Sequence, residues 1–348
     1  MGQYGYTTGS EQLDESIDGL IAAAGATANQ DVLREIMVTA IKLIADNAER
    51  ADLKIINSTF KELRYSLKVF KQYRKIPKVS VFGSARTKEN DPGYLQAKYF
   101  SAEIAKRGWM VITGAGPGIM EAATKGAGRE KAFGINIRLP FEQKPNVEIS
   151  GDKKLINFKY FFTRKIFFLR EAKAIVLLPG GFGTFDEGYE ALTLLQTGKS
   201  DPKPVVLLEG EGSDFWTKWV EFFHKEMIPR KLISQEDTRL FFKTKKVKEA
   251  VEEIIGFYYN YHSIRYVRDL LVVRVNKVTK KMLKRANSEF TDLLVKGDFE
   301  TSSALPEEAN EPLLAEKPRI VFCFNRASFA RLRAFIDMLN EEAKQSGS

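Results

Sequence analysis

The segment LLPGGFGTFDE, residues 177–187, combines a glycine-rich turn with one hydroxyl and two carboxylates. The apolar run AIVLLPGG before it predicts a buried strand, and TFDEGYEALTLLQTG after it predicts a helix that ends at Gly198. Such turns favour anions, because unpaired N–H groups and the helix dipole both attract negative charge. Asp186 and Glu187 would repel an anion, so their position calls for a chemical role or for an interaction with the helix dipole.

Four residues of this turn could hold a phosphate group: Gly180, Gly181, Gly183 and Thr184. Glu187, one helical turn further on, would then lie beside a sugar rather than beside the phosphate. A carboxylate at C1 of a ribose can stabilise an oxocarbenium-like transition state or activate a water molecule. In the structural alternative, Asp186 and Glu187 only complement the helix dipole, and residue type alone favours that alternative.

Two more glycine-rich junctions follow predicted strands. VFGSAR, residues 81–86, offers the N–H groups of Gly83 and Ser84, a hydroxyl and the cation of Arg86. TGAGPGIMEA, residues 113–122, matches neither the dinucleotide fingerprint G-x-G-x-x-G nor the G-K-[ST] ending of a P-loop. Any α/β fold needs tight turns, but three such junctions on one sheet favour a nucleotide monophosphate or phosphosugar site.

A basic pair, Arg164 and Lys165, lies in the predicted helix YFFTRKIFFLREA with phenylalanines on both sides. In one interpretation, the helix buries an aromatic stripe and the basic pair extends to solvent from its other face. In the other, Arg164 forms a bidentate contact with a phosphate or pairs with a catalytic carboxylate. The helix alone does not separate these two interpretations.

The elements around these residues alternate between strand and helix. The runs KVSVF, WMVIT, AFGINIRL, AIVLL and PVVLL predict strands, and amphipathic segments separate them. This alternation predicts an α/β fold with a Rossmann-like, doubly wound parallel sheet, in which ligands bind at the carboxyl ends of the strands. We expect an N-terminal helical extension over residues 1–76, a nucleotide-binding catalytic domain over 77–258 and a C-terminal α/β extension over 259–348.

Within the C-terminal part, we expect a helix over residues 246–270, then a strand and a helix. A polar loop with three prolines follows over residues 297–318, before the strand RIVFCFN and a final helix.

Charge and the scarcity of two residue types exclude several classes of function. The net charge is +9, but the basic runs lie apart with aliphatic or acidic neighbours, which disfavours nucleic-acid binding. The single cysteine, Cys323, excludes an internal disulfide and a cysteine metal site, and only His224 and His262 are available for a triad or a histidine metal site. One cysteine and no apolar run of about 18 residues lead us to expect a cytoplasmic protein without a membrane partner.

The assembled motifs resemble the Lonely Guy (LOG) family of cytokinin-activating phosphoribohydrolases, whose members often carry the label "lysine decarboxylase". PGGFGTFDE fits the family pattern P-G-G-x-G-T-x-x-E, and the RK pair lies upstream, with Arg164 23 residues before Glu187 (187 − 164 = 23). FGSAR and TGAGPGIMEAATKGA are similar to two further nucleotide-binding segments of the family. The resemblance covers residues 78–255.

The resemblance implies a Rossmann-like fold, a homodimer or larger homo-oligomer, and hydrolysis of nucleoside 5′-monophosphates to free base and ribose 5-phosphate. It makes Arg164 and Glu187 the catalytic pair and requires no metal or organic cofactor. It also implies a set of substrate contacts: Ser84, Gly114, Glu121, Lys165, Gly180, Gly181, Gly183 and Thr184.

The chain departs from compact members of the family in FGINIRLPFEQKPN, residues 133–146, and in its two extensions. Longer bacterial relatives carry such extensions, and some act on ordinary purine or pyrimidine monophosphates, so the preferred base stays open. We expect the extensions to enlarge an oligomer interface. The alternative function is a non-catalytic nucleotide carrier or sensor that uses the same phosphate turn.

Overall fold

The computed structural model describes residues 5–139 and 144–346, so residues 140–143 of the divergent segment 133–146 lie outside it. The chain forms two compact units, residues 1–64 and residues 65–348. The first unit contains helices α1 (Glu11–Ala23) and α2 (Gln30–Ala45) and most of α3 (Arg50–Lys71). Its buried core is small and consists of Ile17, Ile21 and Val38. These helices confirm the predicted N-terminal helical extension.

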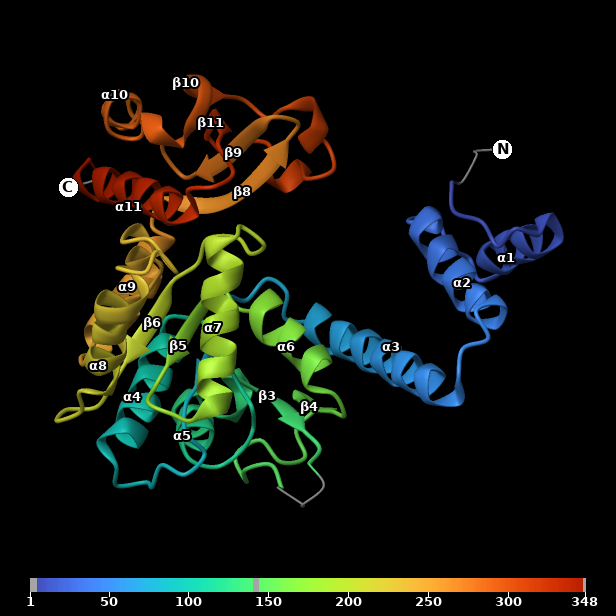
Figure 1. Ribbon diagram of the computed structural model, residues 1–348, viewed down its shortest axis with the longest axis horizontal. Coiled ribbons are helices and arrows are strands. Elements are labelled where there is room, and N and C mark those ends of the chain that lie inside the picture. Colours follow the sequence, from blue (N-terminus) through green and yellow to red (C-terminus); the bar gives the residue numbers. More distant parts are fainter. Residues whose placement is uncertain (1–4, 140–143, 347–348) are drawn as a thin grey trace. The chain divides into compact units, whose positions relative to one another are not determined.

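The second unit is built on a seven-stranded sheet in which every pair of neighbours is parallel, in the order β4-β3-β2-β1-β5-β6-β7 (Figure 1). The strands are β1 (Lys78–Phe82), β2 (Met110–Thr113), β3 (Ala132–Ile137), β4 (Leu155–Phe158), β5 (Ala174–Leu177), β6 (Val205–Leu208) and β7 (Phe242–Thr244). The predicted doubly wound α/β fold is therefore confirmed. The short strands β4 and β7, at the two edges, were not predicted.

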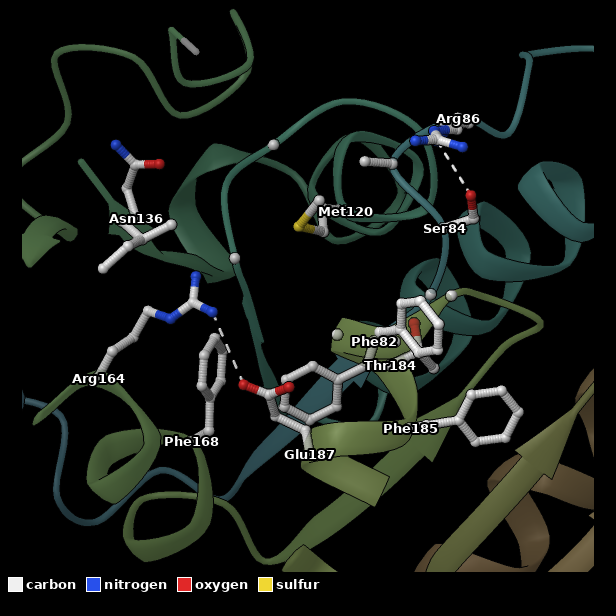
Figure 2. A pocket seen from close by; sticks show the side chains of 18 residues that line it. Phe82, Ser84, Arg86, Met120, Asn136, Arg164, Phe168, Thr184, Phe185 and Glu187 are labelled. Atoms are coloured by element: carbon white, nitrogen blue, oxygen red, sulfur yellow. Dashed lines mark hydrogen bonds and ion pairs between the residues drawn. The ribbon is translucent and has the colours of Figure 1, made fainter. Parts of the chain in front are cut away.

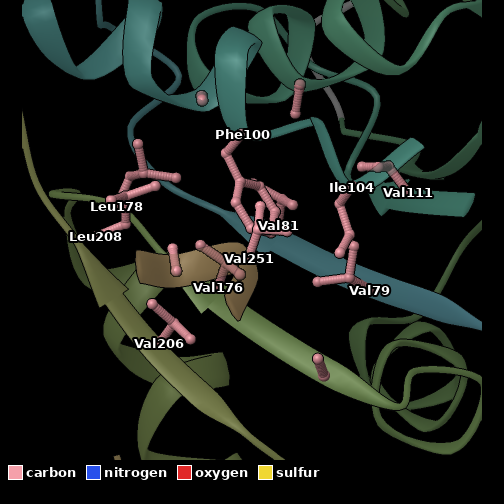
Figure 3. Close-up of a cluster of buried hydrophobic side chains, with 14 of the residues drawn as sticks. Val79, Val81, Phe100, Ile104, Val111, Val176, Leu178, Val206, Leu208 and Val251 are labelled. Carbon is pink, nitrogen blue, oxygen red and sulfur yellow. The ribbon is translucent and has the colours of Figure 1, made fainter. Parts of the chain in front are cut away.

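Helices cover both faces of this sheet, which explains why its strands are apolar throughout. Helices α4 (Pro92–Lys106), α5 (Ile119–Ala127) and α9 (Val247–Phe257) cover one face. In Figure 3, Phe100 and Ile104 of α4 and Val251 of α9 meet the valines of the strands in one buried cluster. A core of this kind fixes the strand ends relative to one another.

The other face carries α6 (Phe161–Arg170), α7 (Phe182–Gln196) and α8 (Phe215–Phe222). Phe70, at the end of α3, is 1% exposed. Its ring stacks on Phe133 of β3 at 4.5 Å and on Phe167 of α6 at 5.7 Å between centroids. Phe167 and Phe168 of the RK helix are therefore buried on this side, where they fix α6 against the sheet.

The C-terminal part forms a second, antiparallel sheet in the order β10-β11-β9-β8, which packs on two helices. Its elements are β8 (Tyr261–Val267), β9 (Leu270–Val275), α10 (Lys280–Glu289), β10 (Leu294–Ser302), β11 (Arg319–Phe324) and α11 (Phe329–Gln345). The predicted C-terminal α/β extension is confirmed, whereas the domain limits at residues 76 and 258 stay predictions.

Two details of the C-terminal prediction were wrong. The helix expected over residues 246–270 ends at Phe257, because the Asn340 side chain accepts hydrogen bonds from the N–H groups of Asn260 and Tyr261 and donates one to the Phe257 carbonyl. The loop expected over residues 297–318 begins as strand β10, which pairs with β11. Both errors reflect long-range contacts that local sequence patterns do not contain.

No helix in the described part of the chain is long and apolar enough to cross a membrane.

We predict that Phe70→Ala lowers the free energy of unfolding by about 3–5 kcal/mol, because it removes a fully buried ring from the contact between α3, β3 and α6. Chemical denaturation of the full chain, followed by circular dichroism, measures this loss. Tyr65→Ala is the matched control, since Tyr65 lies on the same helix and is 46% exposed; its effect should stay within about 0.5 kcal/mol. Equal losses in the two variants would contradict this account of how α6 is held.

Candidate active site

The direction of the chain through the sheet reverses between β1 and β5. From β1 the chain proceeds to β2, β3 and β4 on one side, and from β5 it proceeds to β6 and β7 on the other. The connections that leave β1 and β5 lead to opposite sides of the sheet, so the helices that follow these two strands lie on opposite faces. This arrangement leaves a crevice between them at the carboxyl ends of the strands. The predicted glycine-rich junctions after β1, β2 and β5 end at this crevice.

Ser84 connects the three junctions through its backbone. Its N–H donates to the Pro179 carbonyl at 3.1 Å, and its carbonyl accepts from the Ile119 N–H at 3.0 Å. Gly118 has φ = +66°, and a Cβ there would lie 2.4 Å from the Ser84 carbonyl oxygen, so only glycine fits this position. Sequence segments far apart in the chain therefore form one rigid surface.

The glycines at the start of α7 are of two kinds. A Cβ on Gly180 would lie 2.1 Å from Oγ1 of Thr184, so the packing of the protein itself requires glycine there. By contrast, a Cβ on Gly181 or Gly183 would meet no atom within 4 Å, and neither residue has a left-handed backbone. Nothing in the described fold explains these two glycines, whereas close approach of a ligand to the backbone would.

A cavity of about 600 Å³ opens at this surface, a volume in the range of small-molecule sites. It is lined by Phe82, Gly83, Ser84, Ala85, Arg86, Gly114, Gly116, Met120, Asn136, Ile137, Arg164, Phe168, Gly181, Phe182, Gly183, Thr184, Phe185 and Glu187. The lining combines aromatic and apolar walls with a few polar groups, as is typical of sites for organic ligands.

Arg164 of α6 and Glu187 of α7 face each other across the cavity wall (Figure 2), with 3.7 Å between Nη2 and Oε1. Glu187 is 3% exposed, and its Oε1 has no hydrogen-bond donor among the described residues. Nε of Arg164 is also buried without an acceptor in that part of the chain. Buried polar atoms usually have a hydrogen-bond partner, so these two atoms indicate a site where a ligand or water could supply one.

Burial raises the pKa of Glu187 above its ordinary value, although the nearby cations of Lys165 and Arg164 act in the opposite direction. Burial likewise lowers the pKa of Arg164, against the opposing effect of Glu187 and Asp186. The Arg164 guanidinium is packed between aromatic rings, 4.9 Å from the ring centroid of Phe161 and 5.4 Å from that of Phe168. The site therefore holds an ion pair in a water-poor environment, where electrostatic interactions are strong.

Lys165 faces α7 rather than the cavity. Its Nζ lies 2.8 Å from Oδ2 of Asp186, 2.7 Å from Oε2 of Glu190 and 3.9 Å from Oε1 of Glu187. Burial alone would lower the pKa of Lys165, but the hydrogen bonds to Asp186 and Glu190 outweigh it and raise the pKa. Lys165 therefore ties α6 to α7 and keeps Arg164 and Glu187 at their separation.

The structure brings most of the predicted site residues together. Ser84, Gly114, Arg164, Gly181, Gly183, Thr184 and Glu187 line the cavity. Gly180 borders an adjoining cavity of about 440 Å³ that also contacts Ser84.

Two predicted contacts, Lys165 and Glu121, are absent from the cavity lining formed by the described residues. Each follows a lining residue in a helix, and one step along a helix turns a side chain by about 100°. Thus Arg164 and Met120 point into the cavity, while Lys165 and Glu121 point elsewhere.

Several lining residues were not singled out from the sequence, chiefly Phe82, Met120, Asn136 and Phe168. The three apolar ones could not be distinguished from core residues by type. Asn136 was detectable in principle, because it is an amide in the otherwise apolar strand AFGINI.

Comparisons with known proteins agree with this picture. Residues 119–254 match the family model described as "Possible lysine decarboxylase". The cytokinin riboside 5′-monophosphate phosphoribohydrolase LOG7 of Arabidopsis thaliana is 27% identical over 183 residues, which are 51% of this chain and 80% of that protein.

Among solved structures, the molybdenum cofactor carrier protein of Chlamydomonas reinhardtii is 25% identical over 52% of this chain and 99% of its own, with a TM-score of 0.37. The molybdenum cofactor binding protein of Rippkaea orientalis is 21% identical over 52% of this chain and 97% of its own, with a TM-score of 0.35. Because both TM-scores are below 0.5, these likenesses say nothing about what this chain binds.

The matched segment begins with α5 at the second glycine junction, contains both Arg164 and Glu187, and ends within α9. The family match therefore falls on the domain that builds the cavity. The α/β domain of this chain is therefore similar to the Lonely Guy (LOG) family.

Proposed function

We propose that this protein hydrolyses the N-glycosidic bond of nucleoside 5′-monophosphates, either AMP-like nucleotides or cytokinin riboside monophosphates, to free base and ribose 5-phosphate. The observation that carries the proposal is the buried carboxylate of Glu187, 3.7 Å from the Arg164 guanidinium, one turn inside a helix that begins with ligand-accessible glycines. The phosphoribohydrolase relative supports the same reaction.

The start of α7 would hold the 5′-phosphate. The first N–H groups of a helix have no acceptor within it, and the helix dipole adds positive potential there. At α7 these groups belong to Phe182 and Gly183, since the Thr184 N–H already donates to the Gly181 carbonyl, and the side-chain-free positions Gly181 and Gly183 allow phosphate oxygens to approach the backbone. Arg86, in the junction after β1, lines the same cavity and adds a cation.

Glu187 would act at C1 of the ribose. As the bond between C1 and the base nitrogen breaks, its electron pair leaves with the base and positive charge develops on the ribose. The carboxylate stabilises this charge and accepts a proton from the water molecule that adds to C1. The departing base takes up one proton at the nitrogen that was bonded to C1, and Glu187 releases the proton it accepted, so that the step yields free base and the ionised carboxylate. Oε1 is buried without a donor among the described residues, so a hydrogen bond from that water would satisfy it.

Arg164 would hold Glu187 in place and keep it ionised. Its positive charge favours the ionised carboxylate, which burial alone would disfavour. Its Nε, also buried without an acceptor among the described residues, remains available to a substrate oxygen. Arg164 is therefore both a substrate contact and the electrostatic partner of the catalytic carboxylate.

The lining does not fit the decarboxylase in the family description. Amino-acid decarboxylation by pyridoxal phosphate requires a lysine that forms a Schiff base with the cofactor. The described lining of the 600 Å³ cavity contains no lysine, and Lys165 is engaged by acidic side chains of α7.

The exposed apolar side chains of α6 and α7 support a homodimer. Phe161, Phe162 and Ile166 on α6 are 43–50% exposed, and on α7 Phe182 is 95% and Tyr189 is 40% exposed. Rings of this size at adjacent exposed positions are typical of protein interfaces. Our proposal therefore includes a cytoplasmic homodimer whose interface lies next to the Arg164–Glu187 pair.

We predict that Glu187→Gln lowers the rate of base release from AMP by about 100-fold or more, because the amide neither stabilises the ribose cation nor accepts a proton. Chromatographic measurement of free adenine tests this. Glu121→Gln is the matched control, since it removes a carboxylate that is absent from the described cavity lining; it should retain most of the activity. A Glu187→Gln enzyme of near wild-type rate would refute the role of Glu187.

We predict that kcat for AMP falls on the acid side as Glu187 becomes protonated. Because burial raises the pKa of Glu187, the midpoint of this limb should lie above 4.5, the ordinary value for glutamate. The profile of kcat rather than kcat/KM should be recorded, because it reports groups in the enzyme–substrate complex. The residual activity of Glu187→Gln should lack the limb, and a limb that persists there would assign it to another group.

We predict that Gly183→Ala folds with an unchanged melting temperature but binds AMP about tenfold or more weakly, which corresponds to about 1.4 kcal/mol. The added methyl group meets no protein atom within 4 Å but occupies the space assigned to the phosphate. Calorimetry and thermal melting measure the two quantities separately. An unchanged affinity for AMP would place the phosphate elsewhere in the cavity.

A further inference from the structure

Asn136 is a polar residue at the carboxyl end of β3, a strand whose residues are all buried. It is 8% exposed and lines the cavity. Its Nδ2 donates to Oδ1 of Asn157, its partner in β4, at 2.8 Å. This bond fixes the orientation of the amide and uses one of the two N–H groups of Nδ2.

The amide keeps one acceptor and one donor for a ligand. An asparagine amide has two N–H donors and one carbonyl acceptor. Asn157 uses one N–H, and no described residue donates to Oδ1 of Asn136. In Figure 2 the carbonyl oxygen of Asn136 points into the cavity, and Arg164 lies between Asn136 and Glu187. With the ribose beside Glu187, Asn136 lies on the side away from the phosphate, where the base belongs.

The walls on this side are suited to a flat ring. Met120, Ile137 and Phe168 line the same cavity as Asn136. Apolar and aromatic walls bind any base through its faces and do not distinguish one base from another. Hydrogen bonds at the edge of the ring therefore have to supply the selectivity.

We propose that Asn136 selects bases whose Watson–Crick edge carries an amino group next to an unprotonated ring nitrogen, that is, adenine and cytosine. This inference rests on the proposed hydrolysis of nucleoside monophosphates. Oδ1 accepts from the exocyclic amino group, and the remaining N–H of Nδ2 donates to the adjacent ring nitrogen. Hypoxanthine, guanine and uracil present a carbonyl beside a ring N–H at this edge. Oδ1 would then face the carbonyl oxygen, another acceptor, and the N–H of Nδ2 would face the ring N–H, another donor. A site built for such hydrogen bonds rejects the mismatched analogue strongly.

The test compares AMP with IMP and CMP with UMP, because each pair differs at this edge of the ring. Specificity constants for base release should favour the amino member by roughly 10- to 100-fold in the wild type. Asn136→Leu, which removes both hydrogen bonds and keeps the branched shape of the side chain, should bring both ratios close to one. Asn157→Asp retains the acceptor for Nδ2 and should preserve the ratios, whereas Asn157→Leu should reduce them.

Wild-type ratios near one, or ratios that Asn136→Leu leaves unchanged, would overturn the inference. Circular dichroism verifies that each variant is folded. If Asn136→Leu does not fold, the Asn157 variants still test whether Asn136 selects the base. If the wild type releases no base from any nucleotide, the proposed function fails, and calorimetric affinities for AMP and IMP then decide the inference separately. Tighter binding of AMP that Asn136→Leu abolishes would support it, and equal or absent binding would sink it.

Discussion

The burial of one carboxylate opposite one guanidinium determines how the rest of the site is built. Glu187 is 3% exposed, and its raised pKa means that the ionised form is disfavoured by the fold. The pKa of Glu187 is higher in the folded protein than in the unfolded chain. Its contribution to the free energy of unfolding is therefore complete at pH values below the pKa in the unfolded chain, and it is lost as pH rises through the pKa in the folded protein. At neutral pH the protein therefore keeps a carboxylate ionised where burial destabilises it, and Arg164 and Lys165 only partly compensate. Active sites commonly retain such groups at the expense of stability.

The architecture supplies this pair with a rigid frame. Arg164 and Glu187 lie on different helices, so their distance depends on how α6 and α7 are held against the sheet. The stacked rings of Phe70 and Phe133 hold α6 against the sheet. Lys165 joins α6 to α7 through two acidic side chains of α7. The backbone of Ser84 then joins the glycine junctions at the point where the sheet changes direction. A 1 Å displacement in such a site is enough to reduce a rate strongly, which explains why so many distant contacts converge here.

Much of this arrangement could be predicted from the sequence, and the successes share a physical cause. Strands that are buried on both faces are apolar throughout, and the glycines after β1, β2 and β5 mark where each strand ends, so the sheet and its ligand-binding edge follow from local pattern. The failures involve long-range contacts. The strand β8 was read as helix, because the hydrogen bonds of Asn340 that end α9 come from a residue some 80 positions away.

The candidate site shows the same division. Most residues that carry a motif line the described cavity, whereas Lys165 and Glu121, which we expected to contact the substrate, are absent from that lining. Spacing in a sequence specifies neighbours along a helix but not which of them faces a cavity. Asn136 was missed for a related reason, since a single amide in an apolar strand becomes meaningful only when its neighbour Asn157 and the open cavity are seen together.

The most direct test of the account is a time course of AMP incubated with the protein, followed by ³¹P and ¹H NMR in one tube. Cleavage at C1 of the ribose predicts that AMP is replaced by ribose 5-phosphate and free adenine, with no inorganic phosphate. Adenosine and inorganic phosphate would show that the phosphate bond is the one attacked, and the assignment of Glu187 to the ribose would be wrong. AMP that binds but stays intact would contradict catalysis altogether and leave a nucleotide carrier or sensor as the function of this cavity.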